Sequence, residues 1–138
     1  MADTGNTATI VFGTSGFTAN YTRIGSTSQE RESLEVTTIA TTGEKLYQPN
    51  DLIEPGEFSC EFHWDQSAST FPPISAVAET ITVTYPLKAG ESTAATLAGT
   101  GYLKSSSGPD LVNGEIMSGE FTVQWDGTTG PSYTAGAA

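Results

Sequence analysis

The sequence predicts an all-β fold, a small β-sandwich or half-barrel with at most one short helix. Thr (22 residues), Ser (14) and Gly (15) dominate the 138-residue chain. Thr favours strands, whereas Gly and Ser mark turns. Several segments alternate apolar and polar side chains with the period of a strand, and turn signals separate them. Six or seven short strands therefore fit within one domain.

The first half of the chain predicts two strands and two long loops. The structured part starts near Ile10, and residues 17–24 predict a strand with one irregularity. Residues 25–33 contain no apolar side chain and predict an exposed loop. Residues 34–40 resume a strand pattern, and residues 41–56 predict a second long loop with apolar anchors.

The second half predicts four strands. The clearest is segment 57–65, where Phe58, Cys60, Phe62 and Trp64 share one face and acidic residues share the other. Further strands are predicted over residues 80–86, 94–104 and 115–126. A short helix is allowed after Pro73, within residues 73–79.

The predicted domain spans residues 10–130. Residues 1–9 are small and polar and predict a flexible N-terminus, and residues 131–138 predict a mobile C-terminal tail.

Charge and cysteine content exclude several classes of partner. Sixteen acidic and five basic side chains give a net charge of −11, which leaves no basic patch for nucleic acid. An acidic surface repels nucleic acid without a specific site. The single Cys60 forms no intramolecular disulfide, and no cationic, apolar leader follows Met1, so synthesis in the cytoplasm is expected. Apolar runs are too short to cross a membrane.

No catalytic or metal-binding pattern stands out, so we expect no enzyme and no cofactor. His63 lies on the polar side of its strand and Cys60 on the apolar side, which favours an interface or solvent position for the first and a packing role for the second. Carboxylates on every second or fourth residue allow an acid–base pair but are more typical of a solvated face. Asp51 and Glu54 lack the spacing of a calcium loop.

The order of features resembles a known family. It runs LEVTTIATTGEKLYQPN, EPGEFSCEFHWD, ETITVTYPLKAGES, YLKSSSGPD and GEIMSGEFTVQWDG. This order resembles the major tail tube proteins of long-tailed bacteriophages over about residues 17–130. The resemblance implies a homohexameric ring, stacked with its copies into a hollow virion tail that meets other tail proteins and no membrane. DNA passes through this conduit during ejection. The sequence departs from the family in residues 66–79, where Pro72 and Pro73 stand in place of a clearer helix.

The resemblance also assigns surfaces. A wall that lets DNA slide needs like charge and no cation–phosphate pairs. On that ground the lumen-lining residues are expected on the polar faces of acidic strands: Glu35, Thr37, Glu57, Glu61, Asp65, Glu120 and Gln124. The ring-stacking residues are expected in the two long loops: Glu30, Arg31, Glu32, Lys45, Tyr47 and Asp51. Charge reversal of Arg31 is expected to impair assembly.

Three alternatives remain at this stage. One is another virion or appendage component, such as a tail terminator, a capsid decoration protein or the tube of a contractile secretion device. A second is a carbohydrate-binding or adhesin module that exposes Trp64 and Trp125. The third, a hydrolase using the carboxylates, has the least support.

Overall fold

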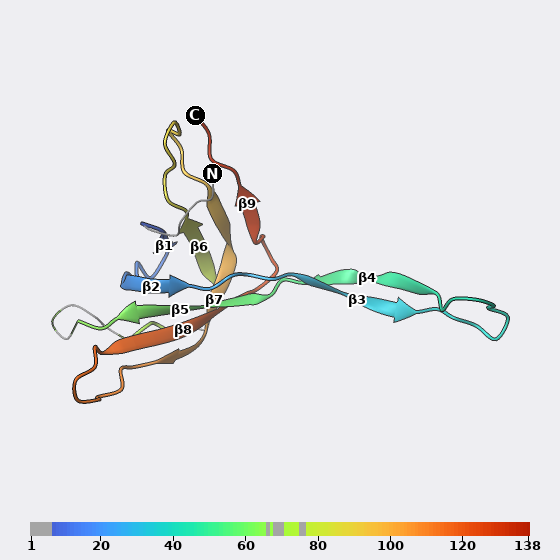
Figure 1. Ribbon diagram of the computed structural model, residues 1–138, viewed down its shortest axis with the longest axis horizontal. Helices are drawn as coiled ribbons and strands as arrows, with labels where there is room; N and C mark the ends of the chain where they lie inside the picture. The colour runs from blue at the N-terminus through green and yellow to red at the C-terminus, as the bar shows by residue number, and fades with distance from the viewer. Residues whose placement is uncertain (1–6, 66, 68–70, 75–76) are drawn as a thin grey trace.

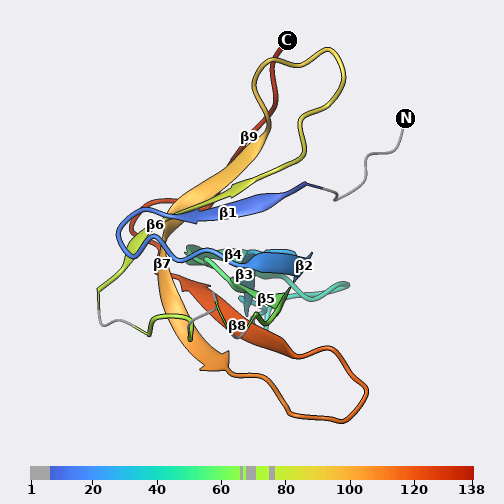
Figure 2. The same ribbon diagram turned by 90° about the vertical axis from the view of Figure 1, so that its left-hand side faces the viewer.

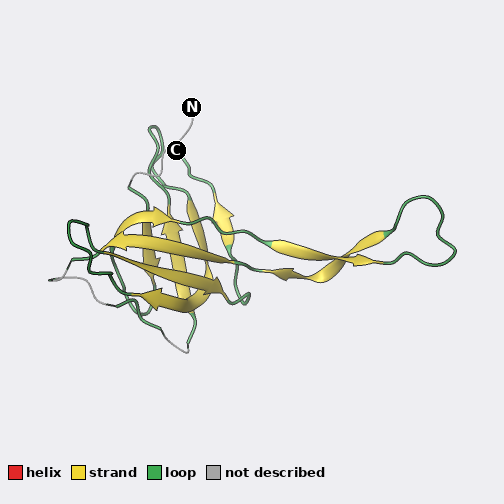
Figure 3. Cartoon of the chain, turned by 60° about the horizontal axis from the view of Figure 1, so that its bottom comes forward, coloured by secondary structure: helices red, strands yellow, loops and turns green. Residues whose placement is uncertain are grey.

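The computed structural model describes residues 7–65, 67, 71–74 and 77–138. Within them the chain forms nine strands and no helix (Figure 3). The strands are β1 (Thr9–Phe12), β2 (Asn20–Ile24), β3 (Glu30–Glu35), β4 (Tyr47–Glu54), β5 (Glu57–His63), β6 (Glu79–Thr84), β7 (Thr96–Ser107), β8 (Ser118–Trp125) and β9 (Ser132–Thr134). All pairings between them are antiparallel. The predicted all-β fold is confirmed.

Seven strands form one curled sheet, which we call the body. Their order is β1-β6-β7-β8-β5-β2, with β9 beside the first part of β7. Figure 2 shows the sheet curling around its own inner face, so the body is a half-barrel rather than a sandwich of two sheets. Strands β3 and β4 pair only with each other and leave the body as a separate hairpin (Figure 1).

The body has an aromatic-rich core because its strands alternate inward apolar and outward polar residues. Among the described residues, the buried hydrophobic side chains that form this core are Ile10, Phe12, Phe17, Phe58, Cys60, Phe62, Ile81, Val83, Leu103, Phe121, Val123 and Trp125. Phe17 lies on the β1–β2 connection, where its ring meets Phe12 and Phe121 at centroid distances of 5.8 Å and Phe62 at 6.1 Å. Its side chain therefore packs β1 against β5 and β8 across the inner face of the sheet.

Most of the predicted strands are confirmed with small changes of boundary. The irregularity expected in residues 17–24 is a register shift of the β2–β5 ladder between Tyr21 and Arg23. Strand β5 buries Phe58, Cys60 and Phe62 as expected, and β8 buries Phe121, Val123 and Trp125. The short strand β1 was missed because only four residues pair in it.

The two predicted loops were wrong in part. Strand β3 takes up residues 30–33 of the first and β4 takes up residues 47–54 of the second, whereas residues 25–29 and 41–46 lie outside the strands. The strand predicted over 34–40 ends at Glu35. The polar composition of β3, ERESLE, has no buried face to reveal a strand pattern because all six residues are exposed. A strand exposed on both faces cannot be recognised from apolar alternation.

The C-terminal segment, which was expected to be a mobile tail, pairs with the sheet. Strand β9 pairs with β7, and Ala137 bridges to Thr93. The carboxylate of Asp126 holds the turn between β8 and β9. Asp126 Oδ1 accepts hydrogen bonds from Thr100 Oγ1 at 2.6 Å and from Thr128 N at 2.9 Å. The hydrogen bond from Thr100 lowers the pKa of Asp126.

Two expectations fall partly outside the described residues. Residues 1–6 of the expected flexible N-terminus are not described, and Thr9 already belongs to β1. Residues 75–76 of the allowed helix are not described either. The neighbouring residues 71–74 and 77–78 are not helical.

Candidate assembly interface: the projecting arm

The β3–β4 hairpin projects from one end of the body, and we call its residues 30–54 the arm (Figure 1). Cross-strand pairs place Glu30 opposite Glu54 and Glu35 opposite Tyr47. The register shifts between Arg31 and Ser33, so β4 contains extra residues there. Pro49 is tolerated in β4 because both strands of an isolated hairpin are edge strands.

The arm exposes apolar side chains that a monomer has no means to cover. Ile39 at its end is fully exposed, and Leu52 is 77% exposed. The remaining exposed large apolar residues of the arm are Leu34, Val36, Leu46, Tyr47 and Ile53. A two-stranded hairpin is marginally stable in water by itself, and contiguous exposed apolar surface marks interaction sites. The arm therefore has the properties of an assembly element.

Local hydrogen bonds hold the arm in shape. Near its base, the Arg31 guanidinium donates to the carbonyl oxygen of Asn50, and Leu52 N donates to Asn50 Oδ1 at 3.3 Å. At its end, which we call the tip (residues 36–46), Val36 N donates to Leu46 O at 2.9 Å. Leu46 N in turn donates to Thr37 Oγ1 at 2.8 Å. Both ends of the hairpin are thus fixed by contacts within it.

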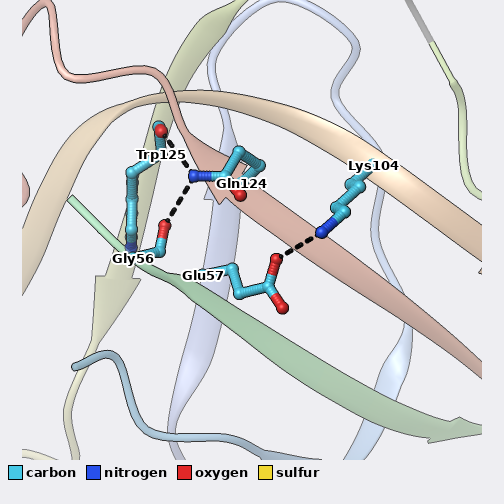
Figure 4. A network of polar contacts seen from close by, with 5 residues as sticks. All are labelled: Gly56, Glu57, Lys104, Gln124 and Trp125. Carbon is cyan, nitrogen blue, oxygen red and sulfur yellow. Dashed lines mark hydrogen bonds and ion pairs between the residues drawn. The ribbon is translucent and has the colours of Figure 1, made fainter. Parts of the chain in front are cut away.

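The base of the arm is attached to the last residues of β8. Trp125 N donates to Gly56 O at 3.2 Å, and the Trp125 indole Nε1 donates to Thr27 Oγ1 at 3.2 Å. Gln124 Nε2 also donates to Gly56 O, at 3.0 Å, and to Trp125 O, as Figure 4 shows. Because Trp125 is itself a core residue, these bonds connect the two segments that flank the arm to the packed core of the body.

Two glycines allow the chain to pass closely at this base. Gly56 has φ +86°, and a Cβ there would collide with the carbonyl oxygen of Ser28. Gly25 N donates to Ser59 O at 2.7 Å, and a Cβ at Gly25 would meet the same oxygen at 2.6 Å. Only glycine accommodates both approaches.

The predicted lumen-lining residues divide between two places. Glu57, Glu61, Glu120 and Gln124 lie together on the outer face of the β5–β8 ladder, where Glu57 is opposite Gln124 and Glu61 is opposite Glu120. Asp65 follows β5 and accepts a hydrogen bond from Ser67 N. Glu35 and Thr37 lie on the arm, apart from the other five residues. The lumen-lining role of all seven stays a prediction.

The outer face of the ladder is acidic with one paired cation. Lys104 Nζ lies 2.9 Å from Glu57 Oε2 (Figure 4). The hydrogen bond from Lys104 to Glu57 raises the pKa of the lysine. Both side chains are about half exposed, so solvent screens this pair and it adds little stability.

The predicted ring-stacking residues all lie on the arm and are all exposed: Glu30, Arg31, Glu32, Lys45, Tyr47 and Asp51. They were assigned to two loops, and the structure brings them onto one hairpin. The attachment of this hairpin through Trp125 was missed. A turn signal at Gly43, which has φ +87°, was the available hint of a hairpin.

The residues considered as candidates for catalysis or sugar binding lie in the core or at the ends of strands. Cys60 is fully buried, and burial raises its pKa to about 12. His63 is exposed at the end of β5. Trp125 is 1% exposed and Trp64 is half-buried against Phe62 and Phe71, so Trp125 offers no sugar-binding platform. Within the described ranges, no group of three or more His, Cys, Asp or Glu is placed to hold a metal ion. The same residues include no helix with the length and apolar character of a membrane span.

No protein-family model matches the chain, and no curated protein matches its sequence. Solved structures do match. A chain of the PVC sheath/tube terminator of an extracellular contractile injection system, in its extended state, superposes with a TM-score of 0.74. Its sequence is 11% identical, and the match covers 98% of both chains. This chain therefore shares the fold of that matched chain.

Two further matches come from the anti-feeding prophage. A chain of its 6-fold symmetrised baseplate has a TM-score of 0.65 at 10% identity and covers 98% of both chains. A chain of its tube-terminating cap has a TM-score of 0.66 at 12% identity, covering 96% of this chain and 94% of the other. At sequence identities this low, the TM-scores establish a common fold and nothing more specific. The near-complete coverage extends that fold over nearly the whole chain, arm included.

Proposed function

We propose that this protein is a ring-forming structural subunit of a phage-tail-like injection apparatus and has no enzymatic role. The observation that carries the proposal is the fold likeness across 98% of both chains to part of a sheath/tube terminator. The exposed apolar arm supports it independently, because such a surface needs a partner. Function is a property of sites, so both the fold and the arm are needed for the argument.

The position we favour is the terminal ring of the tube. Two of the matching structures are described as a sheath/tube terminator and a tube-terminating cap. Repeated use along a tail tube, as in a long-tailed phage, is the second candidate, and the matching baseplate chain is consistent with it. The two positions differ in whether the chain stacks without limit.

In this proposal the arm makes the contacts between subunits. The six residues expected to stack rings lie on it, and none of its residues enters the core of the body. A heterologous contact of an arm with a different surface on the next copy closes into a ring when its rotation allows. Six copies are proposed, as in the 6-fold symmetrised baseplate that contains a similar chain.

The outer face of the β5–β8 ladder is our candidate for the channel wall. Glu57, Glu61 and Glu120 supply carboxylates there, and Lys104 is neutralised by Glu57. Such a face repels the DNA phosphate backbone, so DNA or another anionic cargo slides without binding. Asp65 and Gln124 extend the same polar surface.

The test combines sizing with negative-stain microscopy of the purified chain over a range of concentrations. We expect rings, single or in short stacks, for a terminal subunit; long hollow filaments would favour the repeated tube. A variant with residues 36–46 replaced by an Asn-Gly turn should keep a folded body and lose the rings. A wild-type chain that stays monomeric at every concentration contradicts the proposal.

A further inference from the structure

A groove opens on the body at the end opposite the arm. It is an open depression of about 420 Å³ between the β7–β8 connection and the outer face of β5 and β8. Val112 and Ile116 contribute apolar side chains that are 49% and 75% exposed. Among the described residues, its lining also contains four carboxylates and no lysine or arginine: Glu61, Asp110, Glu115 and Glu120.

The strand register places the groove and the arm at opposite ends of the β5–β8 ladder. The arm joins the β5–β8 ladder where Glu57 pairs with Gln124, and the groove lies where Phe62 pairs with Gly119. The arm points away from that end (Figure 1), and Figure 2 views the body from the groove side with the arm behind it. One molecule therefore cannot fill its own groove, but a second copy can.

The tip has the complementary chemistry. The arm as a whole is acidic, with six carboxylates against Arg31 and Lys45, yet the tip holds only Glu44 and Lys45 and is neutral. Val36, Ile39 and Leu46 add exposed apolar surface. The tip is therefore the one part of the arm that approaches a carboxylate-lined groove without net repulsion.

Lys45 is also the cation suited to this contact. Lys104 is paired with Glu57, and Arg31 donates to the carbonyl of Asn50. Arg23 lies opposite Glu61 on the neighbouring strand β2. Within the part of the chain that the structure describes, Lys45 has neither a hydrogen bond nor an ion pair.

We propose that the tip of one copy docks in the groove of the next, with Lys45 received by Asp110 and Glu115 and with Ile39 against Val112 and Ile116. This inference rests on the proposed ring assembly and specifies its contact. Because Arg23 already faces Glu61, the carboxylates on the β7–β8 connection are left for the incoming lysine. The docked tip covers Glu61 and Glu120, which line the groove, so in this arrangement the proposed channel wall is narrowed to Glu57 and Gln124 at the far end of the ladder.

The experiment is a charge exchange read by analytical ultracentrifugation. Lys45→Glu and Glu115→Lys should each weaken self-association by roughly tenfold or more, and the double variant should recover most of that loss. Lys88→Glu, which makes the same charge change on the β6–β7 connection, is the matched control and should associate like the wild type. Each variant is first checked for an unchanged circular dichroism spectrum.

A cross-link gives a second readout that does not depend on affinity. Cys60 is the single cysteine and is fully buried, so Lys45→Cys with Glu115→Cys adds the reactive pair. Mild oxidation should yield covalent multimers that depend on both new thiols, whereas Lys88→Cys with Glu115→Cys should not.

The outcomes separate this inference from the proposed function. Rings that form normally in both charge variants and resist the Lys45→Cys/Glu115→Cys cross-link overturn the docking contact and leave the ring proposal standing. A wild-type chain that never self-associates overturns both. Recovery in the double charge variant supports both.

Discussion

The indole nitrogen of Trp125 donates a 3.2 Å hydrogen bond to the hydroxyl oxygen of Thr27, on the segment that leads into β3. The bond joins residues 98 positions apart in the sequence. It connects a side chain that is 1% exposed to the entry of a hairpin that is almost entirely exposed. The direction in which the arm leaves the body is therefore set by the core.

Thr27→Val tests this connection. The variant keeps the shape of the side chain and leaves the Trp125 N–H without its partner, which should lower the free energy of unfolding by about 1–3 kcal/mol. Urea unfolding followed by Trp fluorescence measures the change. Thr42→Val in the exposed tip is the control and should stay within about 0.5 kcal/mol of the wild type. Equal stability of both variants would show that the indole bond does not matter.

Gly56 and Gly43 form a matched pair for a second test. Both have positive φ, +86° and +87°, but a Cβ meets the Ser28 carbonyl at Gly56 and open space at Gly43. Gly43→Ala should cost about 1–2 kcal/mol of stability from its backbone conformation alone. Gly56→Ala should cost clearly more because the backbone must also move. Thermal unfolding of the two variants gives the comparison, and similar losses would refute the close approach at the base.

The turn at Asp126 predicts an acid-dependent component of stability. The pKa of Asp126 is lowered in the folded state by the hydrogen bond from Thr100, so its contribution is complete above the unfolded-state pKa of about 4 and is lost as the pH falls through the folded-state value. Melting temperatures between about pH 6 and pH 2 should fall less steeply for Asp126→Asn than for the wild type. Asp51→Asn, which removes the same charge from the exposed arm, is the matched control.

Cys60 should be unreactive in the folded protein. Its pKa is raised to about 12 by burial, so at pH 8 only about one thiol in ten thousand is ionised. A disulfide reagent should leave the native chain unmodified over hours and label it completely in denaturant. Fast labelling of the native chain would mean that the core opens near β5.

The body could be predicted from the sequence because burial leaves a pattern. Alternation in EFSCEFH and SGEFTVQW identified β5 and β8 and their inward faces correctly. Strands β1 (Thr9–Phe12) and β9 (Ser132–Thr134) were not predicted because strands of three or four residues carry too little pattern to recognise.

The arm could not be predicted in the same way. Its strands bury nothing within one molecule, so ERESLE and YQPNDLIE present no apolar face to recognise. Arg31 and Lys45, predicted to stack rings, are exposed on the arm, and their stacking role stays a prediction. Their common location on a hairpin depends on pairing between distant segments, which charge and composition do not encode.

Eleven of the twelve core residues lie on strands of the body and Phe17 lies on the β1–β2 connection, so none comes from residues 30–54. The requirements for folding and for recognition therefore fall on different stretches of sequence. Substitutions in the arm are free to follow those of a partner surface while the half-barrel stays intact. Transplanting the hairpin between related subunits should move their pairing preference along with it.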